Sequence, residues 1–185
     1  MTIGLFRSDV GDAPRRSLLG TALRRVSSFV RAVPHDADAQ RLRRLDQVCV
    51  VLADARQSLI EDGWVQNTWY ARRADPGTTT AACLVGAVVR AARRHEPGAG
   101  PLAAGPTLDV LWDALQESRG MGGPGLAGRA VPPQVRTARV RDLTRWNDRA
   151  GRSRAEVLEL IDLATSRAIM EAMHTSRPEV VGTPR

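Results

Sequence analysis

The sequence predicts an all-α protein: a small helical bundle with long Gly/Pro loops and an N-terminal amphipathic helix. Apolar residues recur at three- and four-residue steps in several stretches, and helix-start and helix-end signals flank these stretches. Gly- and Pro-rich segments separate them. The 185 residues, 43% of them hydrophobic, suffice for one core of ordinary size. Aromatic residues make up only 4%, so Leu, Val and Ala must fill that core.

Residues 1–35 are predicted to consist of a disordered lead up to residue 17 and an amphipathic helix over 18–33. The apolar stripe of this helix faces away from several arginines. Such a helix can pack on the rest of the protein, or it can bind a partner or a membrane surface. The sequence leaves these three alternatives open.

No segment is predicted to cross a membrane or to direct export. Arg15 and Arg16 are similar to a twin-arginine export signal, but Arg24 and Arg25 interrupt the apolar run that such a signal needs. The two cysteines and three histidines lack the spacing of a disulfide framework or a zinc site. We therefore expect a reduced, cytoplasmic protein without a metal site or a cofactor.

Residues 36–175 are predicted to form a single helical domain, followed by a flexible tail over 176–185. Its first helix runs from Asp36 or Asp38 to about Asp62, with apolar residues at helical spacing throughout. Gly63 then stands where a helix-ending glycine is expected.

Three shorter helices follow in the predicted domain. The first is opened by one of the threonines at 78–80 and ends near His95, and Gly86 within it indicates a close approach to another helix. The second is capped by Thr107 and ends at Arg119. The third extends from Val135 to Trp146, with Val135, Ala138, Leu143 and Trp146 facing inward. Gly/Pro linkers over 96–106 and 120–133 separate them.

The last helix has the clearest start signal in the chain. Ser153 and Glu156 have the spacing of a capping box, in which each side chain bonds a backbone N–H of the other residue. Gly151 supplies the turn that precedes it. One face is apolar at three- and four-residue steps: Val157, Leu160, Ile161, Ala164 and Ala168.

A loop over 64–70 places three large aromatic residues within seven positions, with two amide side chains between them. One interpretation is a ligand-binding loop that uses Trp64, Gln66, Asn67 and Trp69. The other is a loop whose rings close one end of the core, which is where aromatic rings usually lie.

A second polar landmark, Trp146-Asn147-Asp148, precedes the last helix. Asn and Asp bond their own backbone in turns, so the simplest interpretation puts Trp146 in the core and lets Asn147 and Asp148 organise the turn. The alternative places all three residues in one ligand site with the 64–70 loop. The sequence does not show whether these segments meet.

An enzyme of small-molecule metabolism is the first alternative to a binding protein. Asp148 could act as a base if neighbouring rings desolvated it and raised its pKa. Cys83 could act as a nucleophile, because a helix N-terminus lowers the pKa of a thiol. No histidine stands near Cys83 in the sequence to serve as its base.

A nucleic-acid interface is the second alternative. The net charge is +7 and every basic residue is arginine, which is typical of GC-rich coding and weakens any conclusion from the total. Basic and acidic stretches alternate, so no basic arm is present. On one predicted helix, however, arginines could contact phosphates from an outward face: Arg136, Arg139, Arg141 and Arg145.

Three blocks in this order resemble an actinobacterial family catalogued only as a domain of unknown function. They are the GW-x-Q block after the first helix, the CL-x-GA block and the WND-x-x-GRS-x-x-EV block, and the resemblance covers about residues 38–170. The resemblance implies no activity. It implies that certain residues occupy the family's signature positions: Gly63, Trp64, Gln66, Cys83, Gly86, Trp146, Asn147 and Asp148.

These observations favour a small cytoplasmic binding or regulatory module over an enzyme. The favoured partner is a protein or a small molecule, with nucleic acid as a further possibility. No motif in the chain specifies a reaction.

Overall fold

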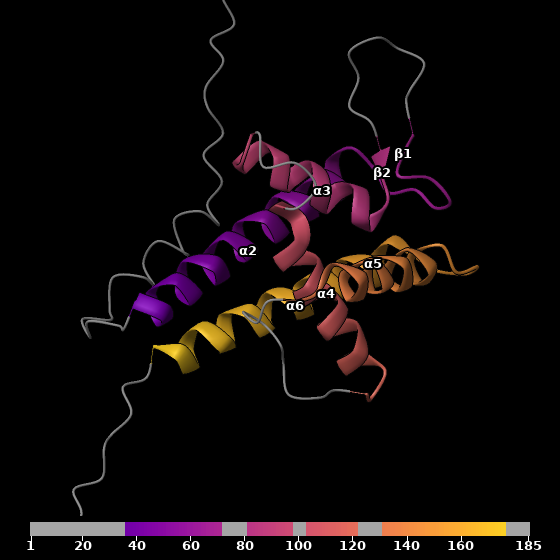
Figure 1. Ribbon diagram of the computed structural model, residues 1–185. Helices are drawn as coiled ribbons and strands as arrows, with labels where there is room; N and C mark the ends of the chain where they lie inside the picture. Colours follow the sequence, from indigo (N-terminus) through magenta and orange to yellow (C-terminus); the bar gives the residue numbers. More distant parts are fainter. Residues whose placement is uncertain (1–35, 72–80, 98–102, 122–130, 177–185) are drawn as a thin grey trace, which may run out of the picture. The chain divides into compact units, whose positions relative to one another are not determined.

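The computed structural model describes residues 36–71, 81–97, 103–121 and 131–176, all within one compact unit, Pro34–Arg185. The expected N-terminal helix over 18–33 and the tail after 176 lie outside the described residues. The residues that the structure describes are mostly helical, which confirms the all-α class (Figure 1). Their elements are α2 (Asp36–Glu61), β1 (Tyr70–Ala71), β2 (Ala81–Ala82), α3 (Leu84–His95), α4 (Gly105–Ser118), α5 (Pro133–Asn147) and α6 (Arg154–Thr175).

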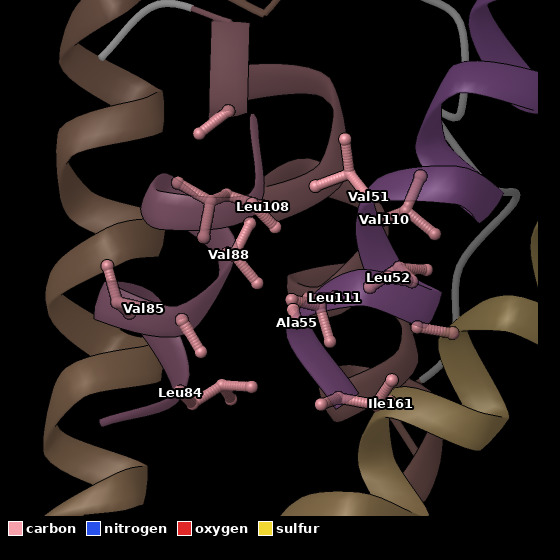
Figure 2. Packing of buried hydrophobic residues seen from close by; sticks show 14 of the residues in the cluster. Val51, Leu52, Ala55, Leu84, Val85, Val88, Leu108, Val110, Leu111 and Ile161 are labelled. Atoms are coloured by element: carbon pink, nitrogen blue, oxygen red, sulfur yellow. The ribbon is translucent and has the colours of Figure 1, made fainter. Parts of the chain in front are cut away.

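The two long helices, α2 and α6, pack side by side along most of their length (Figure 1). Helix α3 packs on α2, and α4 lies against both α6 and α5. Leu52 and Ala55 of α2 meet Leu111 of α4 and Ile161 of α6 in the shared core (Figure 2). As expected from the composition, the largest fully buried side chains are Leu, Ile and Val. None of the helices in the described part of the chain is long and apolar enough to cross a membrane.

The starts of two helices differ from the sequence-based expectation. Helix α3 begins after Cys83, whose sulfur accepts a hydrogen bond from the Gly86 N–H and so takes the capping role expected of a threonine. Helix α4 begins after Ala104, and no side chain caps it. Thr107 is instead buried within the first turn of α4. Both helix starts are buried by packing. The capping residues that sequence rules look for are typical of exposed helix starts, so these rules placed the two starts incorrectly.

Helix α5 begins two residues before the predicted helix and ends one residue after it, and it turns a partly different face inward. Its buried residues are Arg139, Leu143 and Asn147, at steps of four. Val135 and Ala138, expected inside, are exposed. Leu143 is buried and Trp146 packs against the core, as expected. The prediction was wrong for the other two positions because apolar spacing does not detect an inward face on which two of three buried residues are polar.

A small sheet joins the 64–70 loop to the start of α3, and no pattern in the sequence predicted it. Strands β1 and β2 pair antiparallel, Tyr70 with Ala82, and an isolated parallel bridge joins Trp64 to Ala82 on β2. Two-residue strands are too short to show the alternating pattern that predicts a strand. The sheet fixes the aromatic loop against α3.

Gly86 marks a close approach, but the neighbour is this loop and not a second helix. A Cβ at Gly86 would lie 2.4 Å from the carbonyl oxygen of Trp69 and 3.2 Å from Cε1 of Tyr70. The Tyr70 hydroxyl also donates a hydrogen bond to the Gly86 carbonyl at 3.0 Å. The glycine therefore sets the distance between α3 and the loop.

Gly86→Ala is expected to lower the free energy of unfolding by about 1–3 kcal/mol, because backbone must move to admit the methyl group. Urea denaturation measures this. Gly105→Ala in α4 is the comparison variant, since the nearest atoms to its Cβ would belong to the Arg136 side chain, at 2.9 Å, and not to backbone. Equal losses in the two variants would contradict the special role of Gly86.

The capping box at the start of α6 is confirmed. The Ser153 hydroxyl accepts from the Glu156 N–H at 3.3 Å, and the Ser153 N–H donates to a Glu156 carboxylate oxygen at 2.8 Å. Ser153→Ala is expected to cost about 1 kcal/mol of stability. Thermal and urea unfolding measure it, and an unchanged stability would show that these bonds contribute nothing net.

The same bonds to Ser153 lower the pKa of Glu156, and the neighbouring Arg152 adds to the effect. Between this lowered value and the ordinary one, the unfolded chain binds a proton that the folded chain does not. The contribution of Glu156 is therefore complete above the ordinary carboxyl pKa and is lost as the pH falls through the lowered value. We expect Glu156→Gln to show a smaller fall in melting temperature than the wild type between pH 5 and pH 3.

Candidate functional site

The 64–70 loop and the 146–148 turn meet, and Asn147 lies at the centre of the contact. Its side chain is fully buried. Its Oδ1 accepts from the Trp64 indole N–H at 2.8 Å and from the Leu84 N–H at 3.2 Å. Its Nδ2 donates to Asp148 Oδ1 at 2.7 Å and to the Val65 carbonyl at 3.4 Å. The amide group of Asn147 thus has two donors and two acceptors as partners.

Further bonds close the contact on its outer side. Gln66 Nε2 donates to the backbone carbonyls of Asn147 and Arg149, at 2.8 and 3.0 Å. Asp148 Oδ1 accepts from the Asn67 N–H at 2.9 Å. Asn67 has a φ of 60°, and it is the one non-glycine residue with a positive φ in the described part of the chain. Asn tolerates this conformation better than most residues.

We call Trp64, Gln66, Asn67, Asn147 and Asp148 the polar joint. The segments that sequence analysis singled out do converge, but the polar atoms that bring them together largely satisfy one another. This arrangement ties the aromatic loop to the start of α3 and to the α5–α6 turn. The polar joint is therefore a structural contact that acts as a brace between these segments. A buried side chain such as Asn147, whose hydrogen bonds are all made within the protein, offers little to a ligand.

Cys83 is nearly inaccessible, with 1% of its surface exposed. Burial raises the pKa of its thiol, and this effect exceeds the lowering by hydrogen bonds from backbone N–H groups. The backbone N–H groups at the helix start do lower the pKa of Cys83, as expected, but the net shift is upward because burial outweighs them. Cys49 of α2 is likewise buried, and its pKa is raised to about 11. Both thiols stay protonated at neutral pH, which is the unreactive form.

The two remaining aromatic candidates lie outside the polar joint. Trp69 is 48% exposed at the surface. Trp146 is half-buried, and the Arg152 guanidinium lies over its ring, 4.1 Å from the ring centre. Arg152 Nε also donates to the Trp146 carbonyl at 3.3 Å. Trp146 is thus held in place from the α6 side.

Trp146 lines a cleft of about 650 Å³ between the C-terminal ends of α4 and α5 and the first half of α6. Leu160 and Leu163 of α6 contribute apolar surface to it. Its other lining residues are polar or charged: Ser118, Arg119, Asp142, Arg145, Arg149, Arg152, Glu156 and Glu159. The volume lies within the range of small-molecule sites.

Charges in the cleft divide into paired and unpaired groups. Arg119 forms an ion pair with Asp142 at 3.1 Å, and Arg152 forms one with Glu156. Arg145, Arg149 and Glu159 have no ion-pair partner within 4.0 Å among the residues that the structure describes. The cleft therefore presents two uncompensated positive charges and one negative charge.

Two of the four arginines predicted to form an exposed face on α5 are not exposed. Arg139 is 4% exposed and binds Asp109 at 3.1 Å, and its guanidinium lies 4.4 Å from the centre of the Trp112 ring. Arg136 donates to the same carboxylate at 2.8 Å. Asp109 and Asp113 of α4 draw these arginines inward, so Arg141 and Arg145 alone stay exposed.

Sequence reasoning missed the cleft because its charges come from three separate elements. Of its two unpaired arginines, Arg145 belonged to the arginine face predicted on this helix, whereas Arg149 lies in the turn after the helix, where no helical spacing applies. No pattern indicated Glu159, Leu160 or Leu163 as site residues. Across the described ranges, no group of three or more His, Cys, Asp or Glu side chains is placed to hold a metal ion.

Comparisons with known proteins identify the family and nothing further. No curated protein and no solved structure matches the chain at a significant level. A family model described as "Family of unknown function (DUF6197)" matches residues 43–167, close to the range over which the three sequence blocks resemble a known family. This range contains the polar joint and the whole lining of the cleft. The chain therefore belongs to the DUF6197 family of unknown function.

Proposed function

We propose that the protein is a small binding module whose cleft takes an anionic ligand bearing carboxylate or phosphate groups. The observation that carries this proposal is the pair Arg145 and Arg149, two arginines that line one cleft and have no ion-pair partner among the described residues. A guanidinium group matches the geometry of a carboxylate or phosphate and binds it through two parallel hydrogen bonds.

The polar joint supports this role by fixing the segment that carries both arginines. The Arg149 carbonyl accepts from Gln66 Nε2 and from the Arg152 N–H, both at 3.0 Å. The Arg149 N–H donates to the Trp146 carbonyl at 3.4 Å. A backbone held in this way fixes the point from which the Arg149 side chain extends, beside the end of the helix that carries Arg145, and this lowers the entropy lost on binding.

The apolar part of the cleft favours a ligand that also carries carbon surface. Trp146, Leu160 and Leu163 supply carbon surface beside the arginines. A ligand that combines an anionic group with a short carbon chain satisfies both kinds of surface, whereas a simple inorganic ion satisfies only the first. Recognition of this kind requires no reaction, and the polar joint leaves Asp148 bonded to its neighbours instead of facing a substrate.

The test is a titration of the full chain with glutarate and with inorganic phosphate, followed through the indole signals in nitrogen-15 NMR spectra. Glutarate is expected to shift the Trp146 signal, which Trp146→Phe identifies. Arg145→Gln and Arg149→Gln are each expected to weaken binding about three- to tenfold, since each removes one charged hydrogen-bonding group.

Arg141→Gln is the matched control, because Arg141 is an exposed arginine of the same helix that does not line the cleft. It changes the net charge equally and should leave glutarate binding within a factor of two. Duplex DNA serves as a competing anion. If DNA bound in a strongly salt-dependent manner and all three variants weakened it alike, an extended nucleic-acid surface would replace the cleft proposal.

A further inference from the structure

The cleft contains one charge that an anionic ligand alone does not explain. Glu159 lines the same cleft as Arg145 and Arg149, and its side chain is exposed. A carboxylate at this place would repel a purely anionic ligand and reduce the benefit of the arginines. Its presence is therefore informative about the chemistry of the ligand.

The other two acidic residues of the cleft are already neutralised. Asp142 accepts from Arg119, from the Trp112 indole and from Gln116, each at 3.1 Å. Glu156 is engaged by the Ser153 backbone and hydroxyl and by Arg152. These two carboxylates are bound by the protein's own donors, so the uncompensated negative charge of the cleft resides on Glu159.

Glu159 also remains apart from the two arginines. Had Glu159 lain within 4.0 Å of either arginine, the two would form an ion pair, and the described residues show none between them. The cleft thus keeps a negative group and two positive groups at separate points of one cavity of about 650 Å³. Such a pattern is complementary to a molecule with separated charges of the opposite signs.

Resting on the proposed function, we infer that the ligand is a small dicarboxylate that also carries an ammonium group, as an acidic α-amino acid does. Arg145 and Arg149 bind its carboxylates, and Glu159 binds its ammonium group. The carbon chain lies against Leu160 and Leu163. This assignment uses every uncompensated charge in the cleft and leaves none opposed by a like charge.

The experiment compares L-glutamate with glutarate, two ligands that differ only in the ammonium group. Both are titrated into the full-length chain at low ionic strength, and binding is followed by the Trp146 indole signal. Glutamate is expected to bind about three- to fivefold more tightly, the size of an ion pair that stays partly exposed to water. Glu159→Gln is expected to abolish this preference, because it removes the partner of the ammonium group.

Asp46→Asn is the matched control, since it makes the same change in net charge at an exposed residue of α2 outside the cleft. It should preserve the preference for glutamate. If glutarate bound through Arg145 and Arg149 but glutamate bound no better, the inference would fail and the proposed function would stand. A preference that survived Glu159→Gln would likewise overturn the role of Glu159. If neither ligand bound, both the inference and the proposed function for carboxylates would fall.

Discussion

Replacing Asn147 by alanine is expected to lower the free energy of unfolding by about 3–5 kcal/mol. The substitution removes the acceptor of the Trp64 indole N–H and of the Leu84 N–H, and the latter is buried at the start of α3. Each buried donor left without a partner costs about 1–3 kcal/mol. The empty volume of the missing amide adds to this loss. Urea denaturation measures the change.

A double-mutant cycle separates the Trp64 bond from the rest of the loss. In Trp64→Phe the indole donor is absent, so Asn147→Ala in that background is expected to cost about 1–2 kcal/mol less than in the wild type. Additive losses would show that the 2.8 Å bond between the two side chains contributes no coupling energy.

The outcome also decides between the two interpretations of the WND segment. If Asn147→Ala folds with unchanged stability, the polar joint is not a brace, and Asn147 becomes available as a ligand-binding residue. If the protein is destabilised as expected but still binds glutarate once folded, the joint supports the cleft and does not belong to it. Binding is then measured at a temperature where the variant is fully folded.

Much of the helical framework could be predicted from the sequence, because local signals specify it. Helix α2 combines a long apolar period with a glycine at its end, and Gly63 has a φ of 101°. Helix α6 has both members of its capping box in place. Each of these signals involves residues close together in the sequence, so it can be recognised without knowledge of the fold.

The site could be predicted only in part, because its contacts join distant positions. Trp64 and Asn147 are 83 residues apart, and no spacing rule connects them. The sequence identified both as notable but could not show that each is the other's partner. Likewise, burial of Arg139 depends on Asp109 of another helix, so a charged residue on α5 was assigned to the surface.

Asp109→Asn is expected to destabilise the protein by about 3–5 kcal/mol, because it breaks a buried ion pair by removing one partner. Asp109 is 5% exposed and Arg139 4% exposed, so water cannot replace the lost carboxylate charge. The remaining acid near Arg139 is Asp113, at 3.9 Å. Thermal and urea unfolding measure the loss, with the same substitution at Asp142 as the control. Asp142 has a comparable set of donors but is 37% exposed, so Asp142→Asn should cost less than about 1 kcal/mol.

Adding Arg139→Met to Asp109→Asn tests whether the unpaired charge causes the loss. Removing the arginine as well leaves no buried charge without a partner, and the methionine retains apolar contact with Trp112. We expect the double variant to recover at least half of the lost stability. Arg136 also loses the carboxylate charge of its partner, but Arg136 is 25% exposed and can turn to water. A double variant no more stable than Asp109→Asn would place the cost in the aspartate's own contacts. In that case the ion pair would not explain why Arg139 faces the core of the bundle instead of a nucleic acid.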